Sequence, residues 1–152
     1  MNPKSQRRIV GAVLAVPLAN KRVCVAVTLP EADFAFFGPE AVSDATSDRL
    51  FTHRKLFRVA VHKSAWSTGR WQRIAKLAVP SALLAPEPKF IQDTLNPNNF
   101  ELYVGGQITP ASRQDCVGLE CAAVWDPEHV EQRLQDHLAG VPNTSVERLR
   151  IK

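Results

Sequence analysis

The sequence predicts an α+β fold in which a twisted, mainly antiparallel sheet, which could close partly into a barrel, packs against helices in the C-terminal third. Two observations predict this class. From about residue 10 to residue 109, strand-sized runs alternate apolar and polar positions and are separated by turn residues. From Pro110 onward the apolar residues recur at helical spacing, so we expect the helices there.

The first strands are expected to form a hairpin. An apolar run over residues 9–16 stops at Pro17, and residues 19–22 turn the chain into a second run. In that run, residues 23–29, valines alternate with small side chains, so both faces can be covered and the strand should be central. Residues 34–37 predict a third strand, and residues 40–48 a loop or a short helical turn.

Two more strands are indicated in the middle of the chain. Residues 56–63 show the alternation of a half-buried strand, with Phe57, Val59 and Val61 on one side and Arg58, Ala60 and His62 on the other. The outward face of this strand is therefore expected to be basic. Gly69-Arg70-Trp71 begins a further strand that runs through Lys76.

The last β elements and the helices follow. Residues 80–88 are too rich in proline for a sheet and predict a surface connection. Residues 100–104 and 107–109 flank Gly105-Gly106, which predicts a hairpin. Thr109-Pro110 and Asp126-Pro127 each place a capping residue before proline, which predicts two helix starts. The second helix presents a stripe of Val130, Leu134 and Leu138, and Gly140 with Pro142 should end it.

Composition favours one domain in a reducing compartment. A chain of 152 residues that is 45% hydrophobic can bury a core without metals or disulfides. The three cysteines, Cys24, Cys116 and Cys121, are an odd number without a CxxC pair, which favours the cytoplasm. The alternative is a signal peptide, because Lys4, Arg7 and Arg8 precede the first apolar run. No run reaches the roughly 18 apolar residues of a membrane-spanning helix.

The sequence gives little support to catalysis or metal binding, so we expect no enzyme, no cofactor and no metal. The best metal candidate is Cys116 and Cys121 with His129 and His137. The two histidines, eight residues apart, would point about 80° away from each other on a helix. A hydrolase built on Asp93, Glu128 and His129 is the weakest alternative.

Charge is segregated along the chain. Eight basic residues and no acid lie between residues 49 and 86: Arg49, Arg54, Lys55, Arg58, Lys63, Arg70, Arg73 and Lys76. Because Phe51, Phe57, Trp66 and Trp71 are interleaved with them, a small RNA- or DNA-binding module is an alternative function. Residues 115–136 hold six acids and one arginine, and the two segments could pair within the fold.

Four segments carry a resemblance to a known family. They read Gly11-x-Val13-x-Ala15-x-Pro17-Leu18, Gly69-Arg70-Trp71, Phe90-x-Gln92-Asp93 and Gly118-Leu119-Glu120-x-Ala122-Ala123-Val124-Trp125-Asp126-Pro127-Glu128-His129-Val130-Glu131. In this order they resemble the Immunity protein 26 family of bacterial polymorphic toxin systems, over residues 9–143. A basic tail, residues 1–8, and a C-terminal tail, residues 144–152, would flank this single domain. One departure is that residues 19–22 stand where an Asp-Gly type turn is expected.

The resemblance implies a cytoplasmic protein that binds a cognate toxin and blocks it. Because many such toxins attack nucleic acids, their active sites are expected to be basic, and the inhibitor should present acids. The expected toxin-binding residues are Asp115, Glu120, Glu128, Glu131, Gln132 and Asp136. Nucleic acid and membrane are not expected as partners. Trp71 and Trp125 are expected to be structural, and Trp66, between serines, to be exposed.

Overall fold

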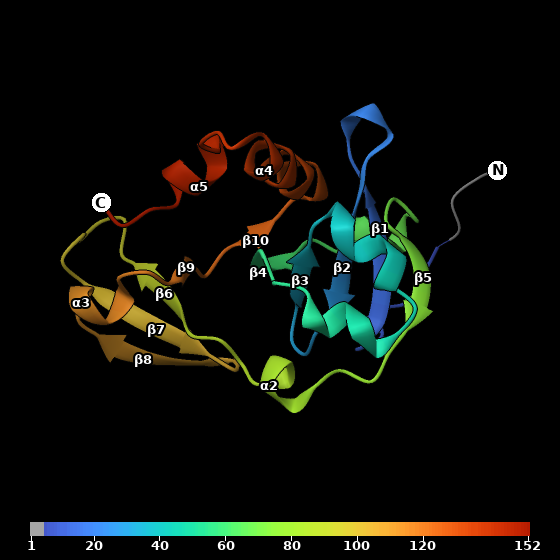
Figure 1. Ribbon diagram of the computed structural model, residues 1–152. Coiled ribbons are helices and arrows are strands. Elements are labelled where there is room, and N and C mark those ends of the chain that lie inside the picture. The colour runs from blue at the N-terminus through green and yellow to red at the C-terminus, as the bar shows by residue number, and fades with distance from the viewer. Residues whose placement is uncertain (1–4) are drawn as a thin grey trace.

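The computed structural model describes residues 5–152, which form two separate sheets joined by helices and loops (Figure 1). The larger sheet has the strand order β10-β4-β3-β2-β1-β5. Its strands are β1 (Ala12–Pro17), β2 (Val23–Thr28), β3 (Asp33–Phe37), β4 (Phe57–Val61), β5 (Gln72–Lys76) and β10 (Val124–Trp125). The smaller sheet, β8-β7-β6-β9, contains β6 (Lys89–Gln92), β7 (Phe100–Val104), β8 (Gln107–Ala111) and β9 (Glu120–Cys121).

The α+β class is confirmed, with a correction to the sheet. The expected single sheet is two sheets, and neither closes into a barrel. Most neighbouring strands are antiparallel, but β10 pairs with β4, and β9 with β6, in parallel. The proline-rich crossing between β5 and β6 carries the chain from one sheet to the other and contains the short helix α2 (Ser81–Leu84).

The prediction that the second strand is central is confirmed. Strand β2 lies between β1 and β3, with Val25 opposite Ala15 on one side and Phe37 on the other. Its residues from Cys24 onward are buried on both faces. The hairpin from β1 turns through the 3-10 helix η1 (Ala19–Lys21), where Asn20 and Lys21 both have φ of 60°. Asparagine tolerates this left-handed region, so the turn forms without glycine.

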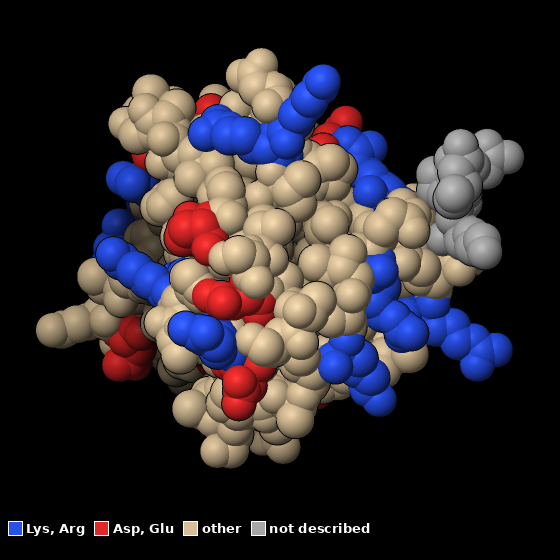
Figure 2. Space-filling model, turned by 45° about the vertical axis from the view of Figure 1, so that its right-hand side comes forward, with Lys and Arg blue, Asp and Glu red and all other residues tan. Residues whose placement is uncertain are grey.

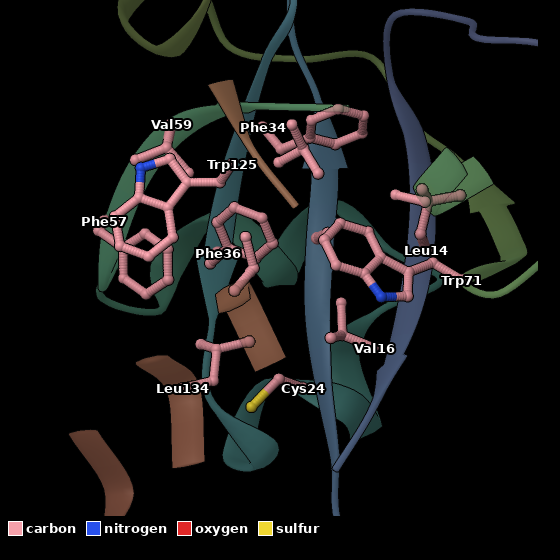
Figure 3. Packing of buried hydrophobic residues seen from close by; sticks show 14 of the residues in the cluster. Leu14, Val16, Cys24, Phe34, Phe36, Phe57, Val59, Trp71, Trp125 and Leu134 are labelled. Atoms are coloured by element: carbon pink, nitrogen blue, oxygen red, sulfur yellow. The ribbon is translucent and has the colours of Figure 1, made fainter. Parts of the chain in front are cut away.

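Aromatic residues dominate one face of the larger sheet (Figure 3). Trp71 is fully buried, and its ring meets Phe34 and Phe36 edge-on, with centroids 6.2 and 5.7 Å apart. Trp125 is 4% exposed in the same cluster. The expectation that both tryptophans lie in the core is confirmed. Trp66 departs from expectation, because it is half-buried and its ring packs against Phe34.

Short helices cover the other face of the larger sheet. Two 3-10 helices, η2 (Pro39–Asp44) and η3 (Asp48–Thr52), bring Ala41 and Leu50 onto the inward valines of β1 and β2. The helical turn expected near residues 40–48 is therefore present. Helix α1 (Ser64–Ser67) connects β4 to β5.

The helix start predicted at Thr109-Pro110 is wrong. Pro110 lies in β8, opposite Glu101 of β7, and β8 is the edge strand of the smaller sheet, where a residue without an N–H is tolerated. The helix begins three residues later as α3 (Arg113–Cys116). The Ser112 hydroxyl caps it by accepting from the Asp115 backbone N–H, and the Asp115 carboxylate accepts from the Ser112 backbone N–H.

The main C-terminal helix is confirmed. Helix α4 (Pro127–Ala139) begins after Asp126 and ends at Gly140, which has φ of 70°. Val130 and Leu134 are fully buried against the aromatic face of the larger sheet, and Leu138 is partly buried there. Helix α5 (Thr144–Arg148) then carries the chain to the smaller sheet, where the backbone of Lys152 bonds Gln92 and Arg113 (Figure 1). Between residues 5 and 152, no helix is long and apolar enough to cross a membrane.

The N-terminal residues contact the larger sheet. The Gln6 side chain donates to the Trp71 carbonyl and accepts from the Arg73 backbone, at 2.7 Å in each case. Arg8 donates to the Leu29 and Asp33 carbonyls. Residues 1–4 of the expected basic tail, among them Lys4, lie outside the described residues.

Candidate functional site

Three of the six predicted toxin-binding residues line one surface depression. Glu128, Glu131 and Gln132, on the outer side of α4, face the turn of the first hairpin at Pro17, Leu18 and Ala19, and Gln135 completes the lining. The depression has a volume of about 390 Å³. We call it the hairpin–helix hollow. It unites the first and the last of the segments that carry the family resemblance.

Glu131 is anchored at the back of this hollow. Its carboxylate accepts hydrogen bonds from Arg70 Nε and Nη2, at 2.7 and 2.8 Å, and from Trp71 Nε1 at 2.9 Å. The hydrogen bond with Glu131 raises the pKa of Arg70, against a smaller opposing effect of burial. The side chain of Glu131 is only 17% exposed. This contact joins the basic and the acidic segments of the chain, so Glu131 holds α4 to the start of β5.

Three other predicted acids also have partners within the chain. Glu120 pairs with Arg133, whose guanidinium lies 3.8 Å from the centre of the Phe57 ring. Asp115 caps α3, and the hydrogen bonds from Ser112 lower its pKa. Asp136 accepts from Gln132 and Asn143.

Glu128 is the exception among the predicted acids. It is exposed, and within residues 5–152 it forms no salt bridge or side-chain hydrogen bond. Gln132 is also exposed, although it donates to Asp136. Glu128 and Gln132 are therefore the predicted residues of the hairpin–helix hollow that are exposed, and Asp115 is exposed on α3, outside the hollow.

The eight basic residues between residues 49 and 86 do not form one surface. The expectation of an outward-facing Arg58 is wrong, because Arg58 is 3% exposed and lies under the α2 crossing. Lys55 pairs with Glu87 and Arg70 with Glu131. The exposed members without an ion pair are Arg49 on η3, Arg54 and Lys63 in the loops on either side of β4, and Arg73 and Lys76 on β5. Figure 2 shows basic side chains along the right of one face, with acidic and basic side chains mixed over the rest.

The aromatic residues of this segment are not free to stack on bases. Phe57 and Trp71 are buried in the core of the larger sheet, and Phe51 and Trp66 are partly buried. A single-stranded nucleic-acid site needs accessible rings beside its cations. The arrangement thus separates the two features that suggested nucleic-acid binding.

The residues of the hydrolase alternative are not brought together. Asp93 lies after β6, where the backbone N–H groups of Leu95 and Asn96 bond its carboxylate and lower its pKa. It lines a different depression from those lined by His129 and Glu128. Asp126, Glu128 and His129 do form an exposed cluster, with ligand atoms within 4.8 Å of one another.

The cysteines are protonated core residues. Cys24 and Cys116 are fully buried, Cys121 is partly buried, and none of the three forms a disulfide. Burial raises the pKa of each thiol, and it raises that of Cys24 to about 11. A neutral thiol is a poor nucleophile and a poor metal ligand.

A second cavity, which sequence reasoning missed, lies between the two sheets. We call it the inter-sheet cleft. It has a volume of about 520 Å³, and Asp33, Arg58 and Lys89 lie in its wall. Their side chains are 10%, 2% and 5% exposed. Asp33 begins β3 and Lys89 begins β6, so only the packing of one sheet against the other brings them together, and no sequence motif could have revealed the cluster.

Comparison with models of protein families, with curated protein sequences and with solved structures finds no significant match.

Proposed function

We propose that this chain is an immunity protein, which acts in the cytoplasm of the producing cell by binding and neutralising a cognate polymorphic toxin. We place the toxin-binding surface at the hairpin–helix hollow. One observation carries the proposal: Glu128, Glu131 and Gln132 line the same hollow as Pro17 and Leu18. Both parts of the hollow belong to the segments that resemble Immunity protein 26.

The chemistry of the hollow suits a basic partner. Glu128 forms no ion pair within the described residues, and apart from a minor electrostatic effect that raises the pKa of Arg70, its charge is available to a cation of the toxin. Asp126, at the start of the same helix, is also exposed. Exposed charges of this kind mainly accelerate association by steering the encounter. The hairpin turn supplies Pro17 and Ala19 as exposed apolar contacts beside them.

Rigidity is the second property that a binding surface requires, and this hollow has it. The Glu131 contact with Arg70 and Trp71 fixes α4 relative to β5, and the buried Val130 and Leu134 fix it to the sheet. A surface that is already in its bound shape loses little conformational entropy on association. The accessible side chains of α4, Glu128 and Gln132, therefore lie on a helix whose position is fixed before a partner binds.

The candidate toxin for the test is the protein encoded by the reading frame next to the gene of this chain. The proposal is tested with the C-terminal domain of that protein. Expression of that domain should arrest a bacterial host, and co-expression of this chain should restore growth. In a binding assay, Glu128→Lys with Gln132→Lys should slow association about tenfold at low salt, with a smaller effect at high salt. Asp48→Lys is the matched control, because Asp48 is exposed on η3, which covers the opposite face of the sheet.

Two results would overturn the proposal. The first is growth arrest that this chain does not relieve. The second concerns the binding surface. If the variant with Glu128→Lys and Gln132→Lys associates with the toxin at an unchanged rate, and reversal of Arg49 and Arg54 to glutamate abolishes association, the interface includes Arg49 and Arg54 and not the hairpin–helix hollow.

A further inference from the structure

The inter-sheet cleft is a mostly apolar cavity with buried charge in its wall. Strands β3, β4 and β10 of the larger sheet form one side, and β6 and β7 of the smaller sheet form the other (Figure 1). The apolar lining includes Ala60, Leu84, Pro86, Ile91 and Val124, together with Tyr103. Its volume of about 520 Å³ lies within the range of small-molecule sites, about 300–1,000 Å³.

The buried charges are arranged around one carboxylate. Arg58 Nε donates to Asp33 Oδ2 at 2.8 Å, and Lys89 Nζ donates to Asp33 Oδ1 at 2.5 Å. Arg58 Nη1 donates to the Leu83 and Ala85 carbonyls at 2.8 and 2.9 Å. One anion thus faces two cations, which leaves one positive charge uncompensated in the buried wall.

The same two cations hold hydrogen-bond donors that no group in the described chain uses. Arg58 Nη2 has no hydrogen-bond partner among residues 5–152, and Arg58 lines the cleft. The ammonium of Lys89 has three N–H donors and one partner, Asp33. Because both residues line the cleft and are at least nine-tenths buried, these donors can serve a ligand inside it.

The excess positive charge belongs to the buried part of the cleft. Glu31 and Glu87 also line the cleft, but Glu31 is exposed and Glu87 is paired with Lys55. The whole lining therefore holds the cations Arg58 and Lys89 against three carboxylates, whereas its buried wall holds the two cations against Asp33 alone.

We propose that the inter-sheet cleft binds a small organic monoanion, a carboxylate carried on an apolar body. The carboxylate would accept hydrogen bonds from Arg58 Nη2 and Lys89 Nζ, and the body would pack against Ile91, Tyr103 and Val124. A monoanion neutralises the single excess charge, whereas a dianion would leave a negative charge unpaired beside Glu31. This site is separate from the hairpin–helix hollow and does not depend on toxin binding.

The test uses 2-naphthoate as the probe and its neutral amide, 2-naphthamide, as the matched ligand. Titrations followed by isothermal calorimetry and by amide chemical shifts should show saturable binding of naphthoate. The largest shifts should fall on β6, β7 and β10, and the neutral amide should bind at least tenfold more weakly. Binding of neither ligand at millimolar concentration, or equal binding of both, would overturn the proposal.

Lys89→Met and its control Lys76→Met test whether naphthoate binds in the inter-sheet cleft. Lys89→Met removes one donor and leaves the Asp33–Arg58 pair, so naphthoate should bind at least tenfold more weakly while the neutral amide is little affected. Lys76→Met, an exposed lysine on β5, is the matched control and should bind as the unmodified chain does. Should Lys89→Met not fold, Ala60→Phe, which fills the cleft from β4 and keeps both cations, should abolish binding. Undiminished binding in the folded variant would refute the assignment.

Discussion

Replacing Glu131 with alanine is expected to destabilise the fold much more than replacing Glu128, one turn earlier on the same face of α4. Glu131 accepts three hydrogen bonds, two from Arg70 and one from Trp71 Nε1. Trp71 is fully buried, so its indole N–H would lose its partner in the core. Glu128 is exposed and forms no such contact within residues 5–152.

The loss of unfolding free energy in Glu131→Ala follows from two contacts, the hydrogen bond from Trp71 and the ion pair with Arg70. A hydrogen bond from a buried donor to a carboxylate contributes about 1.5–3 kcal/mol. The Arg70 pair contributes less, under about 1 kcal/mol, because the Arg70 side chain is 45% exposed and solvent screens it. Glu131→Ala should therefore lower the free energy of unfolding by about 2–4 kcal/mol. Glu128→Ala should change it by less than about 0.5 kcal/mol.

Urea unfolding followed by circular dichroism measures both variants without relying on tryptophan fluorescence. A double-mutant cycle of Glu131→Ala with Trp71→Phe should give a coupling free energy of about 1.5–3 kcal/mol, and the cycle with Arg70→Ala under about 1 kcal/mol. Glu131→Gln, which keeps one acceptor oxygen, should recover part of the loss. Equal stability of the Glu131→Ala and Glu128→Ala variants would refute the structural role of this contact.

Three further predictions follow from burial and charge. Trp125→Ala should cost about 3–5 kcal/mol in a thermal or urea unfolding experiment, and unchanged stability with lost toxin binding would make Trp125 a partner anchor. Burial raises the pKa of Cys24 from the ordinary 9.0 to about 11, so the free energy of unfolding should fall by about 2 kcal/mol between pH 9 and 11; Cys24→Ala should flatten this slope. Gel shifts with mixed RNA and DNA should show no submicromolar binding with the steep salt dependence of phosphate contacts, a slope of roughly −0.9 per phosphate.

Local patterns predicted the elements whose ends carry local signals. The two-residue alternation located β2 and β4, and Asp126-Pro127 with Gly140 located α4, because the cap and the left-handed glycine lie in the sequence itself. The same logic failed at Thr109-Pro110. A proline after a capping residue also fits an edge strand, and only the pairing of Pro110 with Glu101 shows which applies.

The candidate sites depend on packing between distant segments, which periodicity does not encode. The alternation in β4 correctly put Arg58 opposite Phe57, yet the α2 crossing and the smaller sheet cover that side as well. Arg58 is therefore buried, although the pattern around it is that of a half-exposed strand. The two-residue strands β9 and β10 are too short to show any period, so the division into two sheets was also beyond prediction.

Several of the residues that carry the family resemblance hold this fold together. Trp125 is in the core, and Glu131 joins α4 to Trp71 and Arg70 of another resembling segment. A resemblance built on such residues is evidence about architecture. Under the proposed function, the choice of toxin lies in side chains that the architecture leaves free, such as Glu128 and Gln132, because changing them alters the surface without loosening the helix. Substitutions at these two positions should therefore change which toxin is bound while leaving the free energy of unfolding nearly unchanged.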